Sequence, residues 1–143
     1  MRISEVLQAK GTEVVTVSPD TTVRELVALL ADKNIGAVLV STSDTPVAGI
    51  VSERDIVRGL AAGIDVLDKQ VGEIMTTSVE TAKPEQTVHE LARLMTLRRI
   101  RHVPVVTDGE LRGMVSIGDV VKSRIDELEF ERDQLESYVS GPG

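Results

Sequence analysis

The chain has 143 residues, of which 41% are hydrophobic, 16 are basic and 23 are acidic, so that the formal net charge is −7. This is enough apolar material for one compact domain, or for two small units that share a core. The only two aromatic residues, Phe130 and Tyr138, lie near the C-terminus, which excludes proteins that stack single-stranded bases on aromatic side chains. The absence of cysteine excludes disulfides, thiolate zinc sites and catalytic thiols.

Other classes of site are disfavoured by charge and spacing. The two histidines, His89 and His102, are not spaced to share a helix face, so we expect no metal site. No apolar run approaches the ~18 residues of a membrane span, and the first eleven residues contain no hydrophobic stretch of the kind found in signal peptides. We therefore expect a soluble cytoplasmic protein without a membrane partner.

In chain order, the first half predicts a short helix, a strand, a longer helix, two strands and a further helix. The short helix has Ser4 as its N-cap and Gly11 just past its end. Thr22 and Glu25 form a capping box at the start of the longer helix. The predicted ranges are 4–10, 14–17, a helix from Thr22, 37–40, 47–51 and a helix from Ser52. Residues 61–72 predict a loop with a short helical turn.

The second half repeats this order, which makes the chain an internal duplication. With an offset of 65 residues, nine of 24 positions in 17–40 are identical to those in 82–105, and with an offset of 64, five of ten in 49–58 match 113–122. The predicted elements of the second copy are a strand at 78–81, a helix capped by Thr87 and Glu90, strands at 103–106 and 111–115, and a helix from Ser116. We expect an α/β (α+β) fold of two β-α-β-β-α repeats related by a pseudo-two-fold axis.

One motif occurs at the same place in both copies, where a strand meets a helix. It reads Gly49-Ile-Val-Ser52-Glu-Arg-Asp55 in the first copy and Gly113-Met-Val-Ser116-Ile-Gly-Asp119 in the second. Ser-x-x-Asp at a helix start is a capping pair, worth about 1 kcal/mol without any ligand. The same free amides also suit an anion, and the aspartate can accept two hydroxyl groups of a ribose. The two interpretations do not exclude each other.

The duplicated unit with this motif resembles the cystathionine-β-synthase (CBS) domain, and the tandem pair resembles a Bateman module. The resemblance covers about residues 3–125, and the stretch Arg101-His-Val-Pro-Val-Val106 is similar to the second strand of that family. Residues 125–139 are similar to the extended C-terminal helix of bacterial stand-alone CBS-pair proteins. We therefore expect repeats at 1–62 and 73–125, a linker at 63–72, and a C-terminal helix and tail at 126–143.

The resemblance implies a regulatory module that binds an adenine nucleotide, of the AMP, ADP, ATP, NAD or S-adenosylmethionine class. It implies that Asp55 and Asp119 take ribose hydroxyls and that Ser52 and Ser116 lie near phosphate. It also implies that backbone groups and aliphatic side chains hold the adenine. The adenine residues carried over are Val15, Ile35, Gly36 and Ala37 in one site, and Val79, His102, Val103 and Pro104 in the other.

The two expected sites differ in charge. Arg54 of the first motif could reach a phosphate, whereas Gly118 of the second lets a ligand approach the backbone closely. The basic cluster Arg98-Arg99-x-Arg101 belongs to the second copy only. Arg98 and Arg99 could equally form a solvated helix end, while Arg101 or His102 is expected to face the cleft between the repeats, although His102 could also be a half-buried strand residue.

The C-terminal segment predicts a helix with an apolar seam. Its seam positions follow the 4-3-4-3-4 spacing of a coiled coil over about two heptads, Arg132 interrupts the apolar row, and Phe130 falls off this seam. The seam positions are Val121, Ile125, Leu128, Arg132, Leu135 and Val139. The helix could lie back on its own domain or pack on a second subunit; we expect the second, in a homodimer.

The sequence contains no catalytic constellation, because the motif serines have no histidine nearby and no carboxylate pair is marked as acid and base. We therefore expect no enzyme, no catalytic cofactor and no bound metal. The expected function is a sensor that acts on an unidentified separate partner through ligand-dependent conformational change. Two alternatives remain: a structural scaffold with vestigial clefts, and a nucleic-acid binder that uses the Arg98–Arg101 cluster, which the net charge of −7 disfavours.

Overall fold

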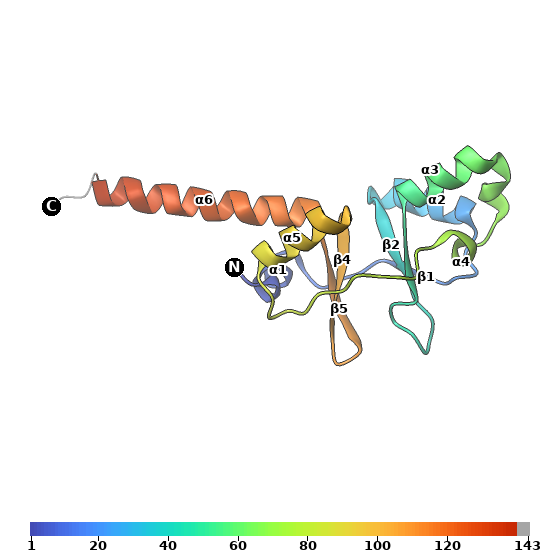
Figure 1. Ribbon diagram of the computed structural model, residues 1–143, viewed down its shortest axis with the longest axis horizontal. Coiled ribbons are helices and arrows are strands. Elements are labelled where there is room, and N and C mark those ends of the chain that lie inside the picture. Colours follow the sequence, from blue (N-terminus) through green and yellow to red (C-terminus); the bar gives the residue numbers. More distant parts are fainter. Residues whose placement is uncertain (140–143) are drawn as a thin grey trace.

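The computed structural model describes residues 1–139, in which two similar halves lie side by side and a long helix projects away (Figure 1). The first part of the chain forms α1 (Ile3–Lys10), β1 (Thr16–Val17), α2 (Val23–Lys33), β2 (Ala37–Val40), β3 (Gly49–Ser52) and α3 (Glu53–Ala62). The second forms the 3-10 helix η1 (Ile64–Asp68), α4 (Val71–Ile74), α5 (Val88–Arg98), β4 (His102–Thr107), β5 (Glu110–Ser116) and α6 (Ile117–Val139). The predicted α/β fold of two repeats with a C-terminal helix is confirmed, and residues 63–72, the predicted linker, hold η1 and the start of α4.

Each half contains a small sheet. In the first, β1 runs parallel to β2, and β2 pairs antiparallel with β3, with Val38 opposite Val51. In the second, β4 pairs antiparallel with β5, with Val103 opposite Val115. All four of these valines are fully buried, because the inward positions of each antiparallel pair face the helices and form the aliphatic core.

The predicted strand at 78–81 is wrong. In the first half, the N–H of Leu39 donates to the carbonyl of Val15, which extends the parallel ladder. The counterpart of Leu39 in the second half is Pro104, which has no N–H to donate. Only the bridge between Ala82 and Val105 remains there.

The helix starts were predicted with mixed success. Thr22 and Thr87 cap α2 and α5 as predicted, each accepting the N–H three residues ahead at 3.1 Å. Ser4 is not a cap, because α1 begins at Ile3. The amides of Ile3 and Ser4 donate instead to carbonyls of the loop before α5, at 2.9 and 3.0 Å, so no side-chain cap is needed.

The leading helix of each repeat packs on the other half. Ile3, Val6 and Leu7 of α1 belong to the core built by α5, β4 and β5, and Val71 of α4 belongs to the core built by α2, β2 and β3. Figure 1 shows α1 beside β5 and α4 beside α3. In the sequence, however, α1 precedes the sheet of β1, β2 and β3, and α4 precedes the sheet of β4 and β5. Neither half is therefore complete without a segment from outside its own sheet.

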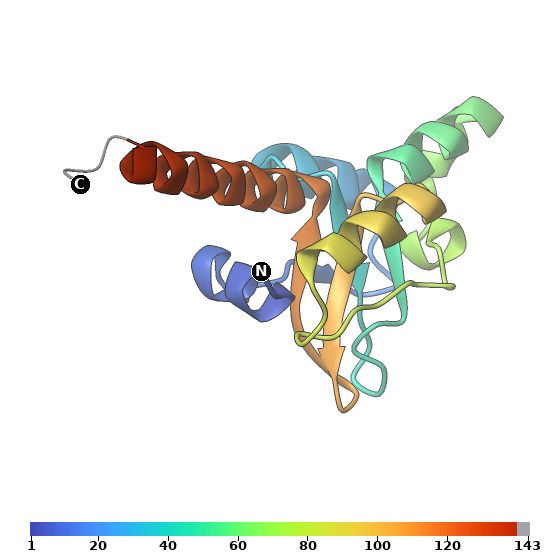
Figure 2. The ribbon, with the colours of Figure 1, turned by 60° about the vertical axis from the view of Figure 1, so that its left-hand side comes forward.

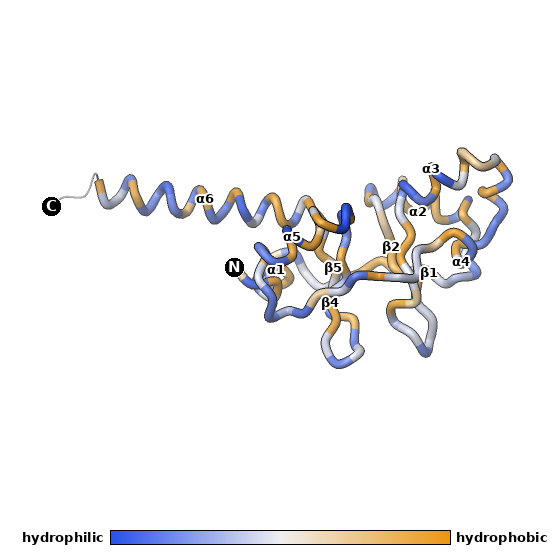
Figure 3. Tube along the Cα trace, viewed as in Figure 1, coloured by the Kyte–Doolittle hydropathy of each residue, from blue (hydrophilic) through white to orange (hydrophobic). Residues whose placement is uncertain are grey.

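The helix α6 leaves the body after its first turns. Val120 and Ser123 are buried, but residues 128–139 are all exposed, and Figure 2 shows this part extending clear of the sheets. Apolar and polar residues alternate along it (Figure 3). The alternative that it lies back on its own domain is thus wrong for 128–139, and residues 140–143 of the predicted tail lie outside the described residues.

A matched pair of glycine substitutions tests the helix exchange. A Cβ at Gly49 would lie 2.9 Å from the carbonyl oxygen of Thr76, which follows α4, and 2.6 Å from Met75 Sδ. A Cβ at Gly113 would meet only the flexible side chain of Leu7, at 2.7 Å. We expect Gly49→Ala to lower the free energy of unfolding by about 2 kcal/mol, and Gly113→Ala by clearly less.

Urea unfolding of both variants measures this difference. Equal losses, or a larger loss for Gly113→Ala, would contradict the packing of the Met75–Thr76 segment against β3.

Candidate functional site

A cavity of about 330 Å³ lies between the two halves, within the size range of small-molecule sites. Its walls come from the segment that joins α1 to β1, from the turn between α2 and β2, and from the ends of β4 and β5. The lining residues are Lys10, Glu13, Val14, Val15, Asn34, Ile35, Gly36, Ala37, His102, Met114 and Ser116.

The first half supplies an aliphatic wall with free backbone. The α2 helix ends at Asn34, whose left-handed backbone (φ 53°) turns the chain sharply into Ile35 and Gly36. A side chain at position 36 would meet Glu53 Oε1 at 3.1 Å and His102 Cε1 at 3.7 Å. The N–H of Ile35 donates to the carbonyl of Leu30 at 3.1 Å, and the carbonyl of Gly36 accepts the N–H of Glu53 at 3.0 Å. Only the remaining peptide groups of this turn are therefore left for a ligand.

The second half supplies polar groups at the start of α6. The N–H of Ser116 donates to Asp119 Oδ2 at 2.8 Å, and the N–H of Asp119 donates to Ser116 Oγ at 3.2 Å. In the first half, Ser52 donates to Asp55 Oδ2 from its N–H, at 2.9 Å, and from its hydroxyl, at 3.2 Å. The capping interpretation of both motifs is thus confirmed, and the aspartates are held rigidly.

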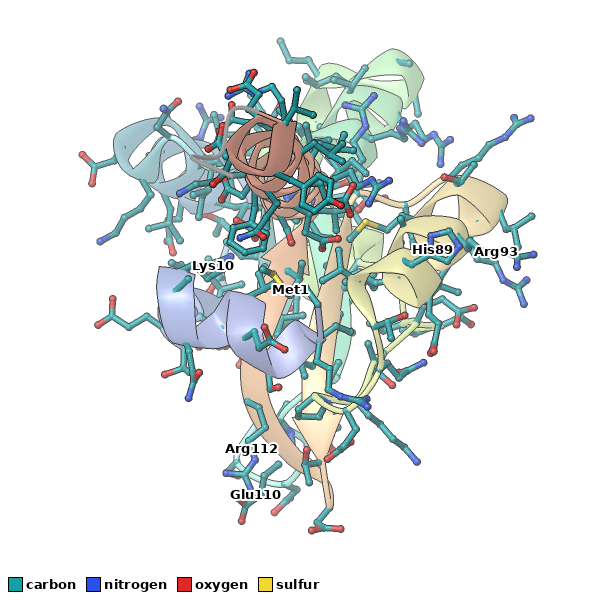
Figure 4. The ribbon with its side chains drawn as sticks, turned by 90° about the vertical axis from the view of Figure 1, so that its left-hand side faces the viewer. Met1, Lys10, His89, Arg93, Glu110 and Arg112 are labelled. Carbon is teal, nitrogen blue, oxygen red and sulfur yellow. The ribbon has the colours of Figure 1, made fainter. Side chains whose placement is uncertain are left out.

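Lys10, the last residue of α1, closes one side of the cavity. Its ammonium group donates to Asp119 Oδ2 at 2.6 Å and to the carbonyl of Met114 at 2.8 Å. About a third of the Lys10 side chain and a fifth of the Asp119 side chain are exposed. This ion pair therefore ties α1 to β5 and α6 at the edge of the cavity. Figure 4 labels Lys10 at the end of α1 opposite to Met1.

The pKa values of two side chains, Asp119 and His102, are lowered at this site. Burial raises the pKa of Asp119, but the hydrogen bonds from Lys10 and Ser116 outweigh this effect, so the pKa stays below its ordinary value. Burial and the charge of Lys10 lower the pKa of His102 from 6.5, against the opposing charges of Asp119 and Glu53. At neutral pH the site thus holds a charged carboxylate and a neutral imidazole.

The structure brings together only part of the predicted site. Val15 and the 35–37 turn meet His102 and Ser116 in one cavity, which joins residues that the sequence assigned to two separate sites. The predicted residues that do not line this cavity are Ser52, Arg54, Asp55, Val79, Arg101, Val103, Pro104, Gly118 and Asp119. Among these, Asp119 is bonded directly to the lining residues Lys10 and Ser116, whereas Arg54, Arg101 and Gly118 are exposed. The side chain of Val103 is fully buried in the core.

The symmetry-related position in the second half is built differently. Val15 has Glu80 as its counterpart, and Glu80 forms an ion pair with Arg98 at 3.4 Å. A charged pair thus takes the place of the aliphatic wall. This contact also gives Arg98 a structural partner, in keeping with the interpretation of Arg98 as part of a helix end.

Sequence reasoning missed Lys10, Glu13, Val14, Asn34 and Met114. Val14 and Asn34 adjoin predicted residues, so a wider window around each strand end would have included them. Lys10 gave no such indication, because its partner Asp119 lies 109 residues away and its helix packs on the opposite half.

Other kinds of site were sought across the described residues. Within 1–139 no helix combines the length and the apolar character needed to cross a bilayer. In the same range no three His, Asp or Glu side chains gather as metal ligands do.

The comparisons with known proteins agree on one family. The sequence model of the CBS domain matches residues 4–62 and 71–126. The CBS-domain protein ATU1752 from Agrobacterium tumefaciens has a similar crystal structure, with 42% identity, a TM-score of 0.84, and coverage of 87% of this chain and 99% of that one.

Two further similar structures contain ligands. The CBS domain protein PAE2072 from Pyrobaculum aerophilum, in complex with AMP, is 35% identical, with a TM-score of 0.74 over 83% of this chain and 89% of that one. The CBS domain pair of protein MJ0100, in complex with 5′-methylthioadenosine and S-adenosyl-L-methionine, is 25% identical, with a TM-score of 0.78 over 89% of this chain and 98% of that one. With two matched repeats and these neighbours, the chain belongs to the CBS-domain family, as a tandem CBS pair.

Proposed function

We propose that this CBS pair is a regulatory module that binds an adenosyl nucleotide in the cavity between its halves. The observation that carries the proposal is the composition of the cavity, with an aliphatic wall and open backbone on one side and hydroxyl, carboxylate and ammonium groups on the other. A purine needs the first kind of surface, and a ribose with its 5′ substituent needs the second.

The proposed binding mode uses backbone in place of aromatic stacking. Adenine would lie against Val15 and Ile35 and hydrogen bond to the peptide groups of the 35–37 turn. The ribose hydroxyls would be accepted by Asp119, whose described hydrogen bonds all use Oδ2 and leave Oδ1 open. Ser116 would donate to the group beyond the ribose.

Support also comes from the related structures that hold AMP and S-adenosylmethionine. Regulation would follow from differential binding, since the cavity walls belong to different halves and a ligand that touches both favours one relative orientation. Ser116 and His102 both line the cavity and lie opposite each other on β5 and β4, which corrects the expectation that no histidine lies near the motif serines. Within residues 1–139 no hydrogen bond joins their side chains, so we expect no catalysis. A scaffold with an empty cleft is the alternative, supported by the many exposed apolar residues of α6.

Thermal unfolding with AMP, ADP, ATP, NAD and S-adenosylmethionine separates these functions. A ligand at about 100 times its Kd adds about 2.7 kcal/mol of stability, which corresponds to an increase of about 9 °C in Tm for a domain of this size. We expect at least one of the five compounds to give such a shift. If none does, the scaffold is the better description.

Matched substitutions of the two motif aspartates test the site. We expect Asp119→Asn to weaken nucleotide binding about tenfold or more, because it removes a charged acceptor from the ribose. Asp55→Asn makes the same change in the same local motif but away from this cavity, so it should leave the affinity within about threefold. Isothermal titration calorimetry gives both values; equal effects of the two variants would remove Asp119 from the site.

We also propose that the protein is a homodimer that pairs through α6. Along the expected seam, Val121, Ile125 and Leu128 are each about half exposed, and Leu135 and Val139 are more so. Such a row has no partner within residues 1–139, and a coiled-coil seam is complementary to a second copy of itself.

Seam and off-seam substitutions test this pairing. Charges at Ile125 and Leu128, introduced as Ile125→Asp and Leu128→Asp together, should convert dimer to monomer in sedimentation equilibrium. Phe130→Asp places one such charge on the same helix at a more exposed position off the seam and should leave the dimer intact. A dimer that survives the double substitution pairs through another surface.

A further inference from the structure

Lys10 occupies a position that breaks the symmetry between the halves. Met114 stands in β5 where Ile50 stands in β3, each one residue after a glycine of the repeated motif. The carbonyl of Ile50 accepts a backbone N–H, that of Thr76, at 2.8 Å. The carbonyl of Met114 accepts the Lys10 ammonium group instead, also at 2.8 Å.

The difference arises from the lengths of the two exchanged helices. Leu7 and Met75 hold equivalent places, each against the glycine of its motif. After Met75 the chain is extended and pairs with β3, whereas after Leu7 the helix continues for another turn to Lys10. A fixed positive charge thus replaces a neutral peptide group on one side only. Within residues 1–139 no ion pair joins a cation to Asp55, the counterpart of Asp119.

This charge stands among acidic groups. Glu13 lines the cavity, Glu53 reaches the 35–37 turn, and Asp119 lies at its edge. The cavity's other basic side chain, His102, has its pKa lowered and is neutral at pH 7. Lys10 is therefore the only positively charged side chain among the lining residues, and the other charged lining side chain, Glu13, would repel a phosphate.

The ammonium group of Lys10 also has one unused hydrogen-bond donor. It has three donors, of which two are used, on Met114 and Asp119. Because Lys10 binds Asp119 Oδ2, a ribose on Oδ1 would hold its 5′ substituent next to the remaining donor and to the Ser116 hydroxyl. That donor favours an anion and disfavours a sulfonium cation.

We propose that Lys10 determines the charge class of the ligand, selecting an adenosine 5′-phosphate over uncharged adenosine and over S-adenosylmethionine. This inference rests on the proposed function, and it chooses between the two ligand classes found in the related structures. It assigns the choice to a residue outside the repeated motif, carried by a helix that precedes the other sheet.

The test is calorimetric titration of the full chain with AMP, adenosine and S-adenosylmethionine. Wild type should bind AMP more tightly than the other two. In Lys10→Gln, which removes the charge but keeps a donor for Met114, the preference for AMP over adenosine should fall about tenfold or more, while the Kd of adenosine stays within about threefold. Lys10→Arg should retain the preference. Lys83→Gln removes the same charge from the exposed loop before α5 and should change nothing.

The possible failures are distinguishable. The selective role would be overturned if Lys10→Gln left the ratio of AMP to adenosine affinity unchanged, or weakened both ligands equally. Lys10 would then have only a structural role, through its contacts with Met114 and Asp119. A wild type that prefers adenosine or S-adenosylmethionine would overturn it as well. A wild type that binds none of the three compounds, and none of ADP, ATP and NAD either, would overturn the proposed function itself.

Discussion

The exchange of leading helices is the constraint on which the rest of the molecule depends. Each sheet buries its inner face under its own long helix, but the remaining side is covered by a helix from another part of the chain. Because α1 packs on β5 and α4 packs on β3, the halves cannot separate without exposing both cores. The close contacts at Gly49 and Gly113 set the distance between each exchanged helix and its strand. Together these contacts place the cavity between the halves.

The three departures from symmetry all act around this cavity. Pro104 shortens the second parallel ladder, the ion pair between Glu80 and Arg98 replaces an aliphatic wall, and Lys10 adds a charge on the other side. Pro104 changes the backbone pairing and the Glu80–Arg98 pair introduces charge at one symmetry-related position, and Lys10 adds a hydrogen-bond donor at the other. A duplicated chain therefore need not have two equivalent sites.

The sequence predicts local structure here better than it predicts the site. The Thr22 and Thr87 caps, the two antiparallel hairpins and the long C-terminal helix depend on neighbouring residues, so their patterns are visible in the sequence. The absence of a strand at 78–81 could also have been predicted, since the alignment of the repeats places Pro104 opposite Leu39. The exchange of α1 and α4 was not, because both cores are aliphatic and nothing in the hydrophobic pattern says which sheet a helix covers. For the same reason the sequence divided Val15 and Ser116 between two sites, and it gave no indication of Lys10.

The position of α6 connects the proposed site to the proposed interface. Its first turn carries Asp119 and follows Ser116, so any ligand held by these two groups is held by the start of the helix itself. The same helix continues without interruption to Val139, beyond the body of the protein. A continuous helix transmits a change of direction at one end to the other, because its backbone hydrogen bonds resist bending. If a ligand alters the angle between the halves, the exposed seam of α6 moves together with the second half. The coupling is limited by the difference in ligand affinity between the two orientations, and it requires no contact between ligand and partner.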